Sequence, residues 1–246
     1  MKHLNWKVLT GLALIAFSGL FYLIHYAIFR DSHHIFLYLI GDIAFLPIEV
    51  LLVTLIIEHL LNEREKQVLL KKMNMLIGAF YSEAGMKLMK YCSGYSSDLL
   101  EIRNRMLITV KWTEKDFSNA MEFVRSSDPK IDSRKGDLKM MRDFLQGKRD
   151  FLLGLLANPN LLEHDAFTDL LWAVFHLAEE LSVRNTLEGL PRTDYDHLSG
   201  DMKRAYTQLL SEWLAYMKHL KSDYPYLFYL AVRMNPMDAD ADPVVK

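Results

Sequence analysis

An uncharged apolar run near the start of the chain limits its fold more than any other feature. Residues 8–29 read VLTGLALIAFSGLFYLIHYAIF and contain no Asp, Glu, Lys or Arg. An α-helix rises about 1.5 Å per residue, so a run of this length crosses the roughly 30 Å hydrocarbon layer of a bilayer. The apolar core of a cleaved signal peptide, the alternative interpretation, usually has only about 7 to 15 residues. The sequence therefore predicts a transmembrane helix over residues 8–29.

A second apolar stretch, residues 35–57, contains two carboxylates, Asp42 and Glu49. Its Leu, Ile, Val and Phe residues together favour insertion by very roughly 7 kcal/mol, whereas two central carboxylates cost about 5 to 7 kcal/mol. Insertion is thus marginal for this stretch alone, and pairing with the first span favours it. Because residues 30–34 leave only a short link, we expect the two spans to form an antiparallel hairpin.

Basic residues near the ends of the two spans set the expected orientation. The connecting loop contains one of them, Arg30, and the other flanking residues lie on the side of the termini. These are Lys2, Lys7, Arg64, Lys66, Lys71 and Lys72. Loops rich in Lys and Arg stay in the cytoplasm. We therefore expect a protein of the cell (inner) membrane with both termini cytoplasmic.

Asp42 and Glu49 are seven residues apart, so they lie about 20° apart on one face of a helix. Pro47 lies between them and removes one amide donor, which frees a carbonyl toward the same interior. Charged groups at this depth almost always face another helix, water or an ion. We therefore expect an intramembrane polar stripe of Asp42, Pro47 and Glu49.

The antiparallel register suggests partners for this stripe on the first span. Asp42 comes level with Tyr22 and within a turn of His25, whereas Glu49 comes within a turn of Ser18, which matches it less well. The poorer match favours a homo-oligomer in which facing copies of the stripe meet. Two readings stay open: structural contacts within an assembly, or the lining of an oligomeric cation or proton channel.

One segment carries a resemblance. Residues 41–66, GDIAFLPIEVLLVTLIIEHLLNEREK, followed by MNMLIGAFYSEAG at Met73–Gly85, resemble a recurring type of uncharacterised prokaryotic two-span membrane protein with a cytosolic helical domain. The resemblance covers residues 41–85 and extends to the segment Leu161–Arg184. The resemblance implies a location in the inner membrane, and it implies no particular activity.

The rest of the chain predicts an all-α fold, because strand alternation is absent and turn residues divide the chain into helical lengths. One of the expected helices extends from Ser133 to Leu156. We expect a transmembrane hairpin over residues 1–57, a neck helix over 58–92, an irregular cytosolic bundle of about five or six helices over 93–235, and a disordered acidic tail over 236–246.

Composition and missing motifs exclude several classes of function. The single cysteine, Cys92, excludes an intramolecular disulfide and a cysteine zinc cluster. A net charge of −2 gives no basic footprint for nucleic acid. The chain also has no phosphate-binding loop and no nucleophile elbow. We therefore predict no enzyme activity, no cofactor and no nucleic-acid partner.

The richest polar stretch, residues 163–184, contains Asp169, His176 and Glu180 on one helix face, at intervals of seven and four. These three are the nearest candidates for metal ligands. A metal site needs ligands that converge from several directions, and we judge that His197 and His219 lack matched carboxylate spacing. The sequence therefore predicts no metal site, and the stretch is expected to be an ordinary amphipathic helix.

Together these patterns predict an oligomeric integral membrane protein whose contacts are the lipid bilayer, further copies of the same chain and a cytosolic protein partner. Its cytosolic helical domain would act as a protein-interaction or signal-relay module. The alternative is an oligomeric cation or proton channel lined by the intramembrane carboxylates.

Overall fold

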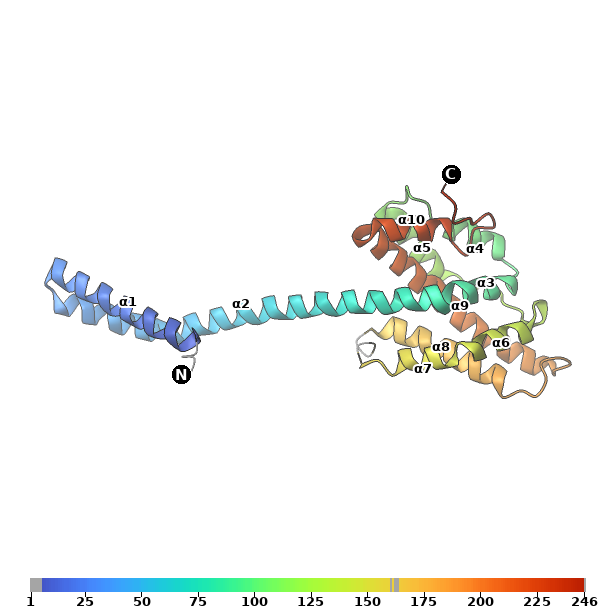
Figure 1. Cartoon of the computed structure of the whole chain (residues 1–246), viewed down its shortest axis with the longest axis horizontal. Coiled ribbons are helices and arrows are strands. Elements are labelled where there is room, and N and C mark those ends of the chain that lie inside the picture. Colours follow the sequence, from blue (N-terminus) through green and yellow to red (C-terminus); the bar gives the residue numbers. More distant parts are fainter. Residues whose placement is uncertain (1–5, 160, 162–163, 246) are drawn as a thin grey trace. The chain divides into compact units, whose positions relative to one another are not determined.

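The computed structural model describes residues 6–159, 161 and 164–245, and among these every regular element is a helix (Figure 1). The only β-type pairing in this part of the chain is an isolated bridge between Ser96 and Ile131. The all-α expectation is thus confirmed. The chain divides into two compact units, Met1–Lys66 and Gln67–Lys246.

The first unit contains α1, Trp6–Phe29, and the start of α2, Ser32–Phe80. Arg30 adopts a left-handed backbone with φ of 50° at the turn between them. Asp31 then begins α2, because its Oδ1 accepts hydrogen bonds from the backbone amides of His33 (3.0 Å) and His34 (3.2 Å). The link is therefore shorter than the predicted residues 30–34.

The apolar side chains of this unit are not covered by other parts of the unit. No residue of α1 is buried, and from Ser32 to Lys66 only Ile35 and Leu39 are even half-buried. α1 and the first part of α2 are both long and apolar enough to cross a membrane. α2 continues through Pro47 without a break.

Most of the predicted neck, the part after Lys66, belongs to the second unit and contributes to its core. The last turns of α2, the π-helix η1 (Tyr81–Gly85) and α3 (Met86–Gly94) supply many of its buried side chains. These are Met73, Ile77, Phe80, Tyr81, Leu88, Met89 and Cys92. The division therefore falls after Lys66, not at the predicted end of the hairpin at residue 57.

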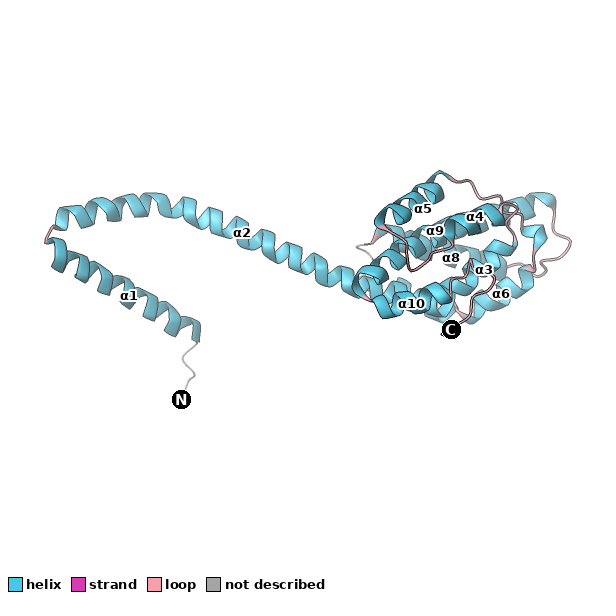
Figure 2. Ribbon diagram, turned by 90° about the horizontal axis from the view of Figure 1, so that it is seen from above, coloured by secondary structure: helices cyan, strands magenta, loops and turns pink. Residues whose placement is uncertain are grey.

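The second unit is organised around α9, Arg192–Asp223, which is visible among the other helices of the bundle in Figure 2. It packs most extensively against α8, Asp165–Ser182, and then against α5, Glu114–Ser126, and α10, Pro225–Arg233. Trp213 and Tyr206 of α9 are among the largest fully buried side chains.

The remaining helices of the bundle are shorter than the sequence suggests. α4 comprises Leu99–Met106, and the single helix expected from Ser133 to Leu156 is instead three elements. These are the 3₁₀ turn η2 (Ser133–Lys135), α6 (Leu138–Gly147) and α7 (Arg149–Leu156). Asp137 starts α6 by accepting from the amide of Met140 at 2.9 Å. Between residues 93 and 235 the described chain thus has seven α-helices, more than the five or six expected.

The segment after α10 differs at its start from the disordered tail predicted from residue 236. Met237 is buried in the core, and its carbonyl accepts a hydrogen bond from Nε of Arg103 at 2.8 Å. The buried side chain of Asn235 donates to the carbonyl of Met106 at 3.0 Å. Apolar burial and two polar contacts therefore fix the beginning of this segment.

Candidate functional site

The predicted partners of the intramembrane stripe line one cavity in the first unit. Ser18, Tyr22 and His25 of α1 and Asp42 of α2 are among the residues around a space of about 520 Å³. Glu49 does not line it. Neither carboxylate has a hydrogen bond or an ion pair within the described residues. Pro47 lies inside α2. That Asp42, Pro47 and Glu49 form a polar stripe within a membrane stays a prediction.

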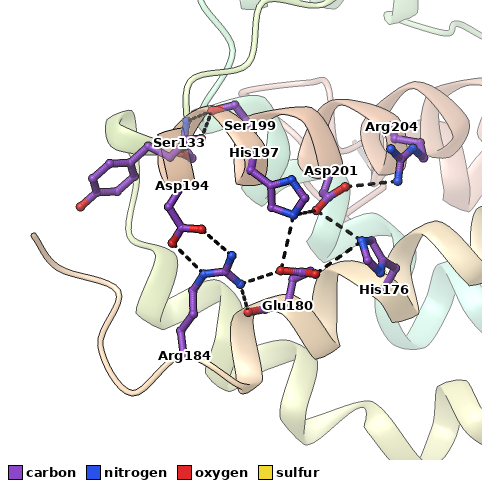
Figure 3. A network of polar contacts seen from close by, with 10 residues as sticks. Ser133, His176, Glu180, Arg184, Asp194, His197, Ser199, Asp201 and Arg204 are labelled. Carbon is purple, nitrogen blue, oxygen red and sulfur yellow. Dashed lines mark hydrogen bonds and ion pairs between the residues drawn. The ribbon is translucent and has the colours of Figure 1, made fainter. Parts of the chain in front are cut away.

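A denser polar cluster lies in the second unit, where α8 and α9 pack together. His176 and Glu180 are one turn apart on α8, and His197 and Asp201 are one turn apart on α9 (Figure 3). Each residue offers one ligand-type atom, and the four atoms lie within 4.8 Å of one another. Two imidazoles and two carboxylates from two helices therefore converge on one point.

The imidazole nitrogens and the carboxylate oxygens of this cluster are close neighbours. Nε2 of His197 lies 3.3 Å from Oδ2 of Asp201 and 3.5 Å from Oε2 of Glu180. Nε2 of His176 lies 3.5 Å from the same oxygen of Asp201 and 3.8 Å from Oε1 of Glu180. Each histidine thus faces both carboxylates.

Asp201 is the buried member of the cluster, with only 3% of its surface exposed. Its Oδ1 accepts a hydrogen bond from Nη1 of Arg204 at 3.2 Å. Its Oδ2, which points at the two histidines, has no hydrogen-bond donor among the described residues. A buried carboxylate oxygen that accepts no hydrogen bond is costly, so this atom marks the centre of the cluster.

Arg184, which follows α8, holds the neighbouring carboxylates in place. Its Nη1 donates a hydrogen bond to Oε2 of Glu180 at 2.7 Å. Its Nε donates to Oδ2 of Asp194 at 2.9 Å, and its Nη2 donates to Oδ1 of Asp194 at 2.7 Å. These hydrogen bonds lower the pKa of both carboxyl groups and raise the pKa of Arg184. Glu180 is therefore ionised at neutral pH and held in one orientation.

Two serines fasten the first turns of α9, from which His197 and Asp201 project. The amide of Ser133 donates to Oγ of Ser199 at 2.9 Å, and Oγ of Ser133 donates to the carbonyl of Tyr195 at 2.8 Å. Ser133 is completely buried. The 3₁₀ turn η2 thereby supports the helix on the side away from α8, as Figure 3 shows.

The structure brings together a different set of side chains from the one that the sequence singled out in this stretch. The structure brings His176 and Glu180 together, but Asp169 is exposed and lies outside the cluster. His197 was judged to have no matched carboxylate, yet Asp201 follows it by four residues, the same spacing as from His176 to Glu180. That repeated spacing was the available signal, because residues at i and i+4 share a helix face.

Comparison with known proteins gives matches along nearly the whole chain. Residues 1–61 match the MJ1433 N-terminal helical domain, and residues 69–233 match the C-terminal helical domain of uncharacterized protein MJ1433. The chain belongs to the MJ1433 family. The division between the two compact units, after Lys66, falls in the interval 62–68 that separates the two matched ranges. This assignment agrees with the resemblance to an uncharacterised helical protein and gives the fold as two helical domains.

A curated relative extends the comparison to full length. Uncharacterized protein MJ1433 of Methanocaldococcus jannaschii is 42% identical over 238 residues, which cover 97% of this chain and 96% of that protein. No solved structure matches.

Proposed function

We propose that this MJ1433-family protein is an integral protein of the cell membrane whose second unit acts as a protein-interaction or signal-relay module. The hairpin of α1 and the first part of α2 is its anchor. One observation carries the proposal: the apolar side chains of the hairpin are uncovered, whereas those of the second unit form a packed core. Both termini lie in the cytoplasm in this proposal, and the anchor brings copies of the chain together.

Burial energetics support an anchor. Soluble monomers rarely expose contiguous apolar patches larger than a few hundred Å². Here Leu14, Ile15 and Leu23 of α1 are each more than 60% exposed, and Ile43 and Ile56 of α2 are 59% exposed. Leaving such side chains in water costs about 1.5 to 3 kcal/mol each relative to burying them. A bilayer removes that cost along the whole hairpin.

The surface of α10 supports a binding role for the second unit. Phe228 packs into the core, while Tyr226, Leu227, Tyr229 and Leu230 remain exposed on the same short helix. Aromatic side chains combine apolar area with a polar group and are enriched in protein interfaces. We expect this face of α10 to contact the cytosolic partner.

Membrane fractionation of the full chain tests the anchor. Expressed protein should sediment with membranes, resist extraction by alkaline carbonate and high salt, and dissolve only in detergent. Recovery of folded protein in the soluble fraction, or its release by carbonate, would contradict an integral anchor.

Crosslinking of intact cells tests the binding role. A crosslinked species that contains one further protein should depend on Tyr226 and Tyr229 and disappear when both are replaced by Ser. Substitution of Trp172, exposed on α8, by Ser is the control and should leave the species intact. The same crosslinked band in all variants would contradict a role for α10.

Asp42 and Glu49 support a second candidate, an oligomeric cation or proton channel. Both carboxylates are exposed on α2 and have no partner among the described residues, so facing copies would supply one. Flux into liposomes should fall or lose selectivity in Asp42→Asn and Glu49→Gln. Glu58→Gln, at the end of the apolar stretch, should leave it unchanged. No wild-type flux, with assembly verified, would remove this candidate.

A further inference from the structure

We propose that His176, Glu180, His197 and Asp201 bind one zinc ion that joins α8 to α9. The cluster lies within the second unit, so a zinc ion there does not depend on the membrane anchor, and the proposed function does not use these four residues.

The residue types select the class of metal. Neutral imidazoles suit zinc and neighbouring transition metals, and carboxylates complete such sites, whereas Ca²⁺ and Mg²⁺ prefer ligand sets made entirely of oxygen. Two nitrogens and two oxygens therefore favour Zn²⁺ over the abundant hard cations. Within the described residues no other group of three or more such side chains is close enough to hold an ion.

The separations suit a tetrahedral ion. Ligand atoms about 2.0 to 2.1 Å from zinc are about 3.3 Å from one another in a regular tetrahedron. With Oε2 as the ligand atom of Glu180, three separations between imidazole nitrogens and carboxylate oxygens are 3.3, 3.5 and 3.5 Å. All the ligand atoms lie within 4.8 Å of one another, and the side chains of His176 and His197 are about half exposed. Because both imidazoles are half exposed, they have room to rotate toward a common ion.

The surrounding contacts prepare the carboxylates for a metal. Arg204 donates a hydrogen bond to Oδ1 of Asp201. Oδ2 of Asp201, which has no hydrogen-bond donor among the described residues, faces the two histidines. Arg184, just after the end of α8, orients Glu180 on that helix. Hydrogen bonds of this kind to ligating carboxylates are typical of metal sites and change affinity by about 10- to 100-fold.

The local charge also favours a cation. Glu180, Asp194 and Asp201 face Arg184 and Arg204, which leaves one excess negative charge when both histidines are neutral. A buried carboxylate pays for its desolvation only when a cation or several donors compensate it. Zn²⁺ supplies that compensation at the point where Oδ2 of Asp201 has no donor.

The number of protein ligands indicates the role of the ion. Structural zinc sites are closed by four protein ligands, whereas catalytic sites keep one position open for water. This site offers four, two from each helix of the pair that packs most extensively in the second unit. The ion would therefore hold α8 against α9 and make the stability of the bundle depend on metal.

Metal titration of the full chain in detergent tests the proposal. After removal of metal by a chelator, the protein should bind one Zn²⁺ per chain against a chromophoric competitor, with a Kd below about 1 µM. Co²⁺ should give the strong visible absorption of a four-coordinate site. Millimolar Mg²⁺ or Ca²⁺ should not displace either ion.

Matched variants locate the ion. His176→Ala, His197→Ala and Asp201→Asn should each weaken zinc binding at least about tenfold and remove the cobalt absorption. His59→Ala, which changes an exposed histidine of α2, should bind as the wild type does. The wild-type measurement decides the matter even if a variant misfolds. Absence of stoichiometric zinc uptake, or uptake that the three variants share unchanged, would overturn the proposal.

Discussion

Nε2 of His197 lies 3.3 Å from Oδ2 of Asp201 across one turn of α9, and that oxygen has no hydrogen-bond donor among the described residues. The same oxygen lies 3.5 Å from His176 on α8. This buried oxygen is thus close to imidazoles from two different helices. Binding of a metal ion there would affect how tightly α8 and α9 pack together. The stability of the second unit should therefore report on that site.

Zinc should stabilise the folded chain through this cluster. A ligand that binds only the native state, at a free concentration of 100 Kd, raises the free energy of unfolding by about 2.7 kcal/mol. Denaturant unfolding followed by circular dichroism, with and without zinc, measures this gain. His197→Ala should abolish this gain in stability, and His59→Ala should retain it. An equal gain in both variants would show that zinc stabilises the protein at a site other than this cluster.

Glu212 of α9 should make the protein less stable as pH rises. Burial raises the pKa of its carboxyl, and its Oε2 has no hydrogen-bond partner among the described residues. A carboxyl whose pKa is higher in the folded than in the unfolded state contributes stability below the unfolded pKa and loses it as pH rises through the folded pKa.

Glu212→Gln removes this titration, so it should stabilise the protein relative to wild type at pH 8 and by less at pH 4. Urea unfolding across this range is the measurement. Glu122→Gln, on the exposed face of α5, is the control and should show no such trend. A stability difference that does not change with pH would contradict the assignment to Glu212.

Cys92 should be chemically silent in the folded protein. It is the single cysteine of the chain, is fully buried, and has its pKa raised by burial to about 12. The thiolate is the reactive form, so at pH 8 a disulfide reagent should find no thiol in native protein and one per chain in guanidinium. Rapid native labelling would show that α3 opens readily.

Gly85 should not tolerate a side chain. A Cβ there would lie 2.6 Å from Cδ1 of Tyr81 and 2.8 Å from Cε1 of Phe80, and both rings are fully buried. Gly85→Ala should therefore lower the free energy of unfolding by about 1 to 3 kcal/mol. Gly154→Ala in α7 meets nothing within 4 Å and should instead stabilise by up to about 1 kcal/mol. Equal changes in the free energy of unfolding from the two substitutions would contradict the conclusion that side chains crowd Gly85.

Local signals in the sequence explain where some of the helices begin. Thr113 begins α5 through a capping box with Asp116, and Pro225 begins α10, as their residue types suggest. The all-α class followed in the same way from helical spacing and from turn residues between the helices. The family match supports this class independently.

Features that depend on tertiary contacts were missed. The π-helix η1 lies where Gly85 has no side chain and the buried rings of Phe80 and Tyr81 come close to its backbone. No local sequence pattern predicts it. The break between α6 and α7 at Lys148 was missed although Gly147, a poor helix former, ends α6 there. The pairing of α8 with α9 across the polar cluster required knowing which helix faces which. Only the repeated histidine and carboxylate spacing hinted at it.

Labelling of single cysteines in intact cells tests the membrane anchor most directly, because silent Cys92 provides a clean background. His33→Cys places a thiol in the first turn of α2, next to the link from α1, and Val245→Cys places one near the C-terminus. An impermeant maleimide should label the first from outside and the second only after the membrane is opened. Labelling of both from outside, or of neither, would contradict a hairpin with its termini in the cytoplasm.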